Sequence, residues 1–217
     1  MNQLDWIQQI TIWILPVLFA VTVHEVAHGW VAHKLGDKTA FFLGRLSLNP
    51  VKHIDLFGTI IVPCLCFLGG NFIFGWAKPV PIDWRNLKNP RRDTALVALA
   101  GPVSNLLMAL LWGGVAKGGM IAVQSGMPMA VFLVYMGSAG IMINVLLMAL
   151  NILPIPPLDG SRVVSSLLPN SAARVYGSIE PYGMIILVAL MLTNTLSKIL
   201  GPMVGWAQVV IFSLFSL

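Results

Sequence analysis

Three ionisable side chains interrupt the first apolar stretch of this chain, residues 10–32, which is long enough to cross a lipid bilayer. They are His24, Glu25 and His28, in the run His-Glu-Val-Ala-His. On a helix, the two histidines lie one turn apart on one face, so both imidazoles can bind one metal ion while Glu25 reaches a water molecule on that ion. Each ionisable side chain near mid-membrane costs about 3 kcal/mol. The pattern therefore predicts a compensating metal ion or a water-filled cavity inside a membrane-spanning helix.

The chain as a whole is too apolar for a soluble domain of its size. Of its 217 residues, 57% are hydrophobic and only 10% are charged, and the mean hydropathy is +0.84. We expect an all-α polytopic membrane protein with about five to six transmembrane helices, forming one integral domain over residues 1–217. The net charge of +5 does not indicate nucleic-acid binding, because the basic residues lie in short loops between apolar runs.

Those basic residues indicate the orientation of the first span. Lys34 and Lys38 follow it, which favours a cytoplasmic location for its C-terminal end. His28 lies about two helical turns from that end, a depth of roughly 10 Å. We therefore expect a multi-pass protein of a prokaryotic inner membrane, with its polar site toward the cytoplasmic side.

Later apolar runs predict further spans. Two are expected at residues 94–115 and 129–153, joined by an external, glycine-rich turn over 116–128. Residues 181–217 are apolar with a break near Gly201, and they predict either one span or two short helices. The run 54–76 differs from these, because glycines and a proline punctuate it and basic loops flank both of its ends.

Basic loops on both flanks of a single crossing violate the positive-inside rule, whereas an even number of passes satisfies it. We therefore favour a re-entrant or β-hairpin element over residues 54–76, close to the polar site. Irregular backbone at membrane depth is tolerated where protein or a water-filled cavity covers it. A plain transmembrane helix is the alternative for this run.

A catalytic zinc ion takes three protein ligands, so the two histidines need a third. Asp159 is the best candidate, because apolar and helix-breaking residues flank it at the membrane end that His28 reaches. His33 and His53 are rivals, but His33 points to another part of the helix and His53 lies in a loop.

At this point the sequence resembles a known family, the site-2 proteases, which are intramembrane zinc metalloproteases of peptidase family M50. Several motifs, spread over most of residues 20 to 165, carry the resemblance. They are His24-Glu25-Val26-Ala27-His28, Gly44-Arg45-Leu46-Ser47-Leu48-Asn49-Pro50, His53-Ile54-Asp55, Gly75-Trp76-Ala77-Lys78-Pro79-Val80-Pro81, Gly101-Pro102-Val103-Ser104-Asn105, and Asn151-Ile152-Leu153-Pro154 followed by Leu158-Asp159-Gly160. The chain is similar to the compact branch of this family, without a PDZ or CBS domain.

The resemblance implies a function and a set of site residues. It implies regulated intramembrane proteolysis of transmembrane or membrane-anchored protein substrates in the bilayer. It also implies that His24, His28 and Asp159 bind one zinc ion per chain and that Glu25 is the catalytic base. Asn105 and Asn151 would lie near the substrate. Both amides have an alternative role, since polar side chains also join membrane helices through hydrogen bonds.

A transmembrane substrate must be locally unwound to be cut, and pairing with an extended segment would compensate for its lost hydrogen bonds. The residues Trp76, Ala77, Lys78 and Pro79 belong to a stretch that its prolines keep extended, and we expect them to bind substrate. The stretch 44–48 is a second candidate. Ordinary interfacial loops are the alternative for both.

Two other functions use the same residues. A metal transporter or metal sensor could use the His and Asp side chains as a transit site, but transporters place such groups at midplane with a route to both faces. Here the ionisable groups cluster near one face. A non-catalytic member that grips transmembrane helices would not need Glu25, since that residue is not required as a metal ligand.

Overall fold

The structure, a computed structural model, describes residues 5–62, 64–65 and 75–217, and this part of the chain is mainly helical. No strand is assigned within those ranges. The α-helices are α1 (Trp6–Leu35), α2 (Thr39–Phe42), α4 (Pro90–Gln124), α5 (Val131–Ile152), α6 (Asp159–Leu167), α7 (Asn170–Gly177), α8 (Gly183–Leu192) and α9 (Thr195–Phe215). Short 3-10 turns cover Pro50–His53, Trp84–Asn86, Pro128–Ala130 and Glu180–Tyr182, and a π-helical turn covers Leu56–Ile61.

Five helical segments within the described ranges are long and apolar enough to cross a membrane. They are Ile7–Leu35, Pro90–Gln124, Pro128–Ile152, Asn170–Leu192 and Thr195–Phe215. The expectation of an all-α polytopic membrane protein is therefore confirmed. Residues 181–217 contain two helices, the shorter α8 and the longer α9, which agrees with the two-helix alternative.

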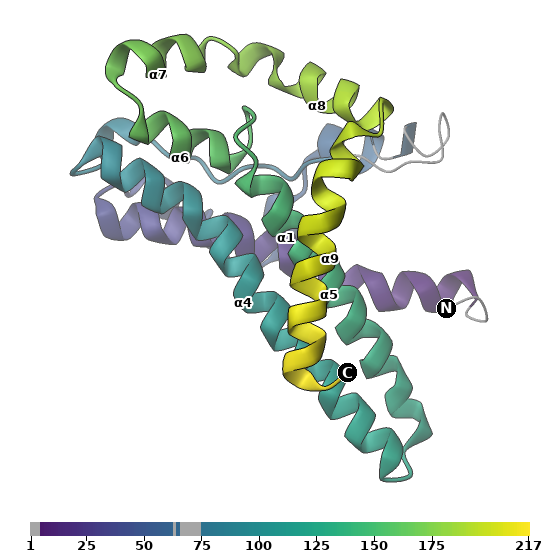
Figure 1. Cartoon of the computed structure of the whole chain (residues 1–217). Helices are drawn as coiled ribbons and strands as arrows, with labels where there is room; N and C mark the ends of the chain where they lie inside the picture. The colour runs from purple at the N-terminus through teal and green to yellow at the C-terminus, as the bar shows by residue number, and fades with distance from the viewer. Residues whose placement is uncertain (1–4, 63, 66–74) are drawn as a thin grey trace.

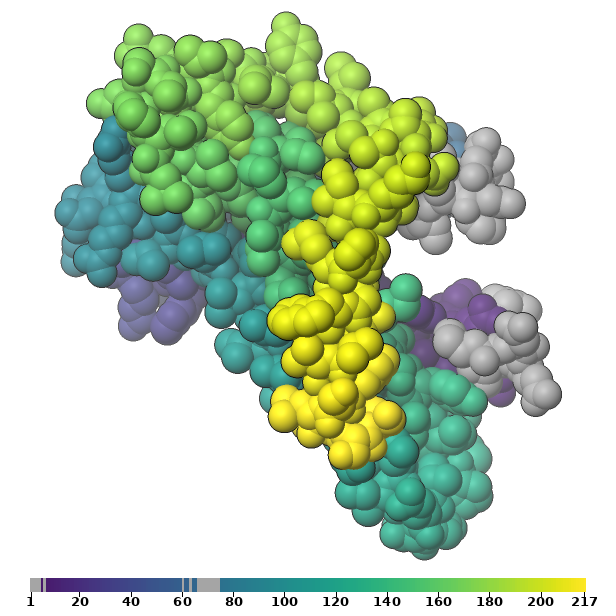
Figure 2. Space-filling model, viewed as in Figure 1, coloured from purple at the N-terminus to yellow at the C-terminus, as the bar shows by residue number. Residues whose placement is uncertain are grey.

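The helices α4 and α5 form the long central pair of the molecule (Figure 1). The helix α9 lies along this pair, and its side chains cover one face of it in the space-filling view (Figure 2). The helix α1 crosses the pair and contacts both helices, while α6 packs against α4 near that crossing. Residues near the start of the chain thus meet residues of its last third.

Small residues allow α4 and α5 to approach closely. A Cβ atom added at Gly137 would lie 2.6 Å from the Cβ atom of Ala116, and one added at Gly140 would contact the ring of Trp112. A Cβ atom added at Gly119 would lie 2.9 Å from Val134 N of α5. The external turn predicted over 116–128 is therefore wrong for most of its length: the helix continues to Gln124, because these small residues serve helix packing.

The predicted re-entrant run 54–76 lies partly outside the described residues. On its N-terminal side, the turn Leu56–Ile61 is π-helical. On its C-terminal side, residues 75–83 are extended and return beside that turn, because Trp76 N donates to Gly58 O at 2.9 Å and Lys78 N donates to His53 O at 2.9 Å. These two hydrogen bonds fall short of a β-ladder, so the β-hairpin is not confirmed.

Candidate metal centre

Three potential ligand atoms converge where α1, α4 and α6 meet. His24 Nε2 and His28 Nε2 lie 3.0 Å apart, and each lies 3.2 Å from Asp159 Oδ2. Both histidines are buried, and the Asp159 side chain is 17% exposed. The HExxH spacing explains the pair on α1, since residues four apart share one helix face. The three residues that the sequence predicted as ligands therefore lie together.

The side chain of Asn105, on α4, orients the ring of His24. Asn105 Oδ1 lies 2.6 Å from His24 Nδ1, while Asn105 Nδ2 donates to Ala20 O at 3.1 Å and to Asn144 Oδ1 at 2.9 Å. Because Nδ2 is the donor of this amide, Oδ1 must accept, and the network assigns the ring proton to His24 Nδ1. His24 Nε2 is then left with a free lone pair.

A backbone carbonyl orients the second ring in the same way. His28 Nδ1 lies 2.7 Å from Val97 O, one of the buried residues of α4. A carbonyl oxygen only accepts, so the ring proton of His28 is on Nδ1 and its Nε2 also carries a lone pair. Hydrogen bonds of this kind fix the tautomer and the ring orientation of metal-binding histidines.

The resulting set of atoms fits a zinc ion. Two imidazole lone pairs and a carboxylate oxygen point at one another, and Asp159 Oδ2 is a buried atom without a hydrogen-bond partner. Such an arrangement is repulsive unless a cation lies among the three atoms. Ligand atoms about 2.0–2.2 Å from a tetrahedral zinc ion lie about 3.3–3.6 Å apart, slightly more than the 3.0 and 3.2 Å found here. The donor set, two imidazoles and one carboxylate, is typical of catalytic zinc.

A glycine on α4 makes the room that the two rings occupy. A Cβ atom added at Gly101 would contact His28 Nε2 and would lie 2.6 Å from His24 Nε2. Any other residue at this position would push a carbon atom between the two ring nitrogens. In the sequence, the Gly101-Pro102 pair fits both the family motif and a helix kink, and the structure places Gly101 at the border of the metal centre.

The position of Asp159 follows from the chain reversal before it. Asp159 is the first residue of α6, and Leu158 N donates to Ile155 O at 2.9 Å in the turn that precedes the helix. The next residue, Gly160, packs on the end of α5, where an added Cβ atom would contact Ile152 O. This close approach carries Asp159 to the histidines of α1.

The carboxylate of Glu25 is partly buried beside the histidines on α1, and it accepts a hydrogen bond from Val80 N at 2.8 Å. Val80 belongs to the extended segment 75–83, which therefore passes over this face of α1. The predicted substrate residues Trp76, Ala77, Lys78 and Pro79 lie in the same segment, just before Val80.

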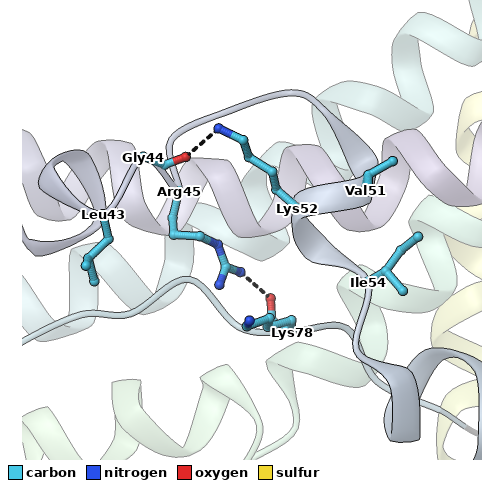
Figure 3. A pocket seen from close by; sticks show the side chains of 7 residues that line it. All are labelled: Leu43, Gly44, Arg45, Val51, Lys52, Ile54 and Lys78. Atoms are coloured by element: carbon cyan, nitrogen blue, oxygen red, sulfur yellow. Dashed lines mark hydrogen bonds between the residues drawn. The ribbon is translucent and has the colours of Figure 1, made fainter.

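The loop before this segment holds it by its backbone oxygens. Arg45 Nη2 donates to Lys78 O at 3.0 Å and to Pro79 O at 3.3 Å, as Figure 3 shows for Lys78. Lys52 Nζ donates to Gly44 O at 2.9 Å within the loop. These residues border a pocket of about 360 Å³, lined by Leu43, Gly44, Arg45, Val51, Lys52, Ile54 and Lys78.

The two predicted amides lie in different places. Asn105 is completely buried behind His24. Asn151 is partly buried in the last turn of α5, where its Nδ2 donates to Leu147 O at 3.0 Å. A substrate role for either residue stays a prediction. The rival ligand His53 lies elsewhere, with its Nε2 2.9 Å from Ser47 O, and the metal-binding group found among the described residues is His24, His28 and Asp159.

Sequence reasoning missed three groups that contact the site residues. Asn144 supports Asn105 and could have been noticed as a second amide, beside Asn151, in one apolar helix. The other two are the backbone carbonyl of Val97 and the backbone N–H of Val80. Nearly every residue carries a backbone carbonyl and N–H, so the sequence alone does not show which of them contact the site residues.

Comparisons with known proteins give one consistent result. The model of "Peptidase family M50" matches residues 12–117 and 114–194. "Putative zinc metalloprotease YwhC" of Bacillus subtilis is 40% identical over 207 residues, which cover 94% of this chain and 90% of that protein. "Putative zinc metalloprotease Rip2" of Mycolicibacterium smegmatis is 30% identical over 87% of this chain and 70% of that protein.

A more distant likeness covers less than half of the chain. "Regulator of sigma-E protease RseP" of Salmonella typhimurium is 32% identical over 103 residues, which cover 45% of this chain and 23% of that protein. No solved structure matches the chain.

Proposed function

This chain belongs to peptidase family M50 and is a zinc metalloprotease, and we propose that it hydrolyses peptide bonds of transmembrane or membrane-anchored proteins within the bilayer. One observation carries the proposal: two imidazole lone pairs and an orphaned carboxylate oxygen converge among helices that are apolar enough to span a membrane. In this proposal residues 1–217 form one protease domain, and His24, His28 and Asp159 hold one zinc ion.

The chemistry divides between the ion and the side chains around it. Zinc, when bound, supplies a Lewis acid that makes water more acidic and polarises the scissile carbonyl. Glu25 takes the proton of the attacking water and delivers it to the leaving amine, because it is the carboxylate next to the ligands that is not itself a ligand. Asn105 keeps the lone pair of His24 Nε2 directed at the site, through its contact with His24 Nδ1.

The extended segment 75–81 supports a way of holding unwound substrate. The N–H groups of Trp76, Lys78 and Val80 all donate to this protein's own atoms, as an extended chain that turns alternate residues to one side requires. Ala77 faces the other side, and its N–H has no hydrogen-bond partner among the described residues. We propose that substrate pairs with this second edge, where the N–H of Ala77 donates and the carbonyl oxygen of Ala77 accepts.

Asn151 is the other proposed substrate contact. It lies at the end of α5, eight residues before Asp159 in the chain, and its Nδ2 is bonded to Leu147 O. The orientation of the site toward the cytoplasm of a prokaryotic cell is part of the same proposal. It is supported by Lys34 in the last turn of α1 and by Lys38 just after that helix.

The test compares the intact protein with Glu25→Gln and Glu180→Gln after purification in detergent. Glu180 is the other glutamate of the chain, and its side chain is 52% exposed. Zinc content and cleavage of a panel of single-span membrane peptides are measured for all three proteins. We expect one zinc ion per chain in each, cleavage by the intact protein and by Glu180→Gln, and none by Glu25→Gln.

Two outcomes contradict the proposal. Cleavage by Glu25→Gln at the rate of the intact protein would remove Glu25 from the mechanism. Zinc in all three proteins, no cleavage by any of them, and zinc flux in liposomes would favour transport through the same site.

A further inference from the structure

A Pro-Val-Pro run places one backbone donor over the active-site carboxylate. Proline has no N–H, so Val80 supplies the only N–H among Pro79, Val80 and Pro81. That single donor lies 2.8 Å from Glu25 Oε2. Val80 is only 5% exposed, so water competes poorly for this hydrogen bond.

The side chain of Val80 makes a second contact with the same face of α1. A Cβ atom added at Gly29 would lie 2.7 Å from Val80 Cγ1 and 2.5 Å from Leu46 Cδ2. Gly29 follows Glu25 by four residues, so the two lie one above the other on the helix. Val80 is therefore seated on α1 by its side chain at Gly29 and by its backbone at Glu25.

The preceding loop also holds the segment that carries Val80. Arg45 Nη2 donates to Lys78 O at 3.0 Å, as Figure 3 shows. Lys78 N donates to His53 O at 2.9 Å. These contacts do not involve Glu25. The loop and the packing thus set the position of the Val80 N–H independently of its hydrogen bond to Glu25.

We propose that the Val80 N–H is a positioning group for the catalytic base, an inference that rests on the proposed function. It holds Glu25 Oε2 and leaves Glu25 Oε1 to take the proton of the attacking water. A glutamate side chain rotates freely about three bonds, and a charge-assisted hydrogen bond from a fixed donor selects one orientation. Misplacing a catalytic group by about 1 Å can cost roughly 100-fold in rate.

The experiment compares Val80→Pro, which removes the donor, with Val80→Ala, which keeps the donor and loses most of the packing on Gly29. For Val80→Pro we expect kcat to fall about 100-fold while KM stays within about twofold and zinc remains at one ion per chain. For Val80→Ala we expect kcat within about threefold of the intact protein. A merely structural role for Val80 would affect both variants alike.

The same substitutions in a Glu25→Asp background test whether Val80 acts through Glu25. The shorter aspartate cannot reach the Val80 N–H, so Val80→Pro should cost less than about fivefold in kcat there. A loss of about 100-fold in both backgrounds would overturn the proposal, because the effect would then be independent of the base.

A second variant covers a failure of Val80→Pro to fold. Gly29→Ala keeps every backbone donor but pushes Val80 away from α1, and it should lower kcat with KM and zinc content unchanged. Gly118→Ala, on the exposed side of α4 with no atom within 4 Å of the added Cβ, is the matched control. Unchanged kcat in Gly29→Ala, or a rise in KM alone, would overturn the inference. An intact protein that does not cleave would contradict the proposed function instead.

Discussion

Replacing Gly101 by alanine tests the metal centre without removing any proposed ligand. The added methyl carbon would lie 2.6 Å from His24 Nε2 and would also contact His28 Nε2. Ordinary contacts between such atoms are about 3.5 Å or longer, so the rings must move by roughly 1 Å. Zinc sites keep their ligand distances within about 0.2 Å, so a displacement of this size disrupts both nitrogen ligands.

The expected result is a loss of zinc affinity of at least about 100-fold, or roughly 2.7 kcal/mol, because displacing groups that only support a ligand already costs about 10- to 100-fold. A competition titration against a chromophoric chelator measures it on protein purified in detergent. Cleavage activity should fall in parallel and should recover in part at high zinc concentration.

Gly118→Ala is the control, since it makes the same change on the same helix with no atom within 4 Å of the new methyl group. By helix propensity alone, alanine favours the helix by up to about 1 kcal/mol over glycine, so this variant should keep both zinc and stability. If Gly101→Ala bound zinc as tightly as the intact protein, the two rings could not be the ligands in the arrangement described here.

Three further predictions concern Asn105, Asp37 and Ala77. Asn105→Ala removes the acceptor of the His24 Nδ1 proton and should weaken zinc binding about 10- to 100-fold. Asn151→Ala should keep zinc binding, because the amide of Asn151 bonds to Leu147 O. Equal zinc affinities of the two variants in chelator titrations would contradict the positioning role of Asn105. Burial raises the pKa of Asp37, but hydrogen bonds from Asn86, Thr39 and Asp83 N outweigh it and hold that pKa below its usual 3.8, so the charged form stabilises the fold. Asp37→Asn should therefore lower stability by about 1–3 kcal/mol at pH 7, and thermal unfolding midpoints should show the difference shrinking as the pH falls below about 3.8; a difference that grows in acid would refute this sign. Ala77→Pro removes an N–H that bonds to none of the described residues and should raise KM about fivefold at unchanged zinc content, while Ala77→Gly should not. Equal KM values would exclude pairing through this group.

The pattern of side chains predicted the centre of the site because its spacing has a direct geometric meaning. Two histidines four residues apart share a helix face, and this alone places His24 and His28 together. Asp159 followed from its apolar, helix-breaking surroundings. The structure brings these three ligand atoms within 4.8 Å of one another. The long apolar runs likewise predicted the spanning helices, because the thickness of a bilayer fixes their length.

The extent of α4 and the groups that support the metal centre could not be predicted from spacing, because they depend on which elements pack together. Glycines over 116–128 favour a turn locally, but packing against α5 makes Gly119 a helix contact instead. The carbonyl of Val97 and the N–H of Val80 are backbone groups, and only the fold selects them from many identical ones. The amide of Asn105 joins helices, as its alternative role predicts, through Ala20 O and Asn144 Oδ1, but its contact with the ring of His24 could not be read from the sequence.

The proposed ligands come from helices made at different times during synthesis. Two ligands enter the membrane with α1, whereas Asp159 begins α6, which the ribosome adds only after α4 and α5. Before α4 is made, His24 and His28 lack the supporting carbonyl and amide of that helix, and until α6 is made they also lack their third ligand. If these three residues are the ligands, as proposed, a chain that ends before α6 cannot hold the ion in this geometry. In this proposal, the active site is complete only after α6, in the last third of the chain, has packed beside α1.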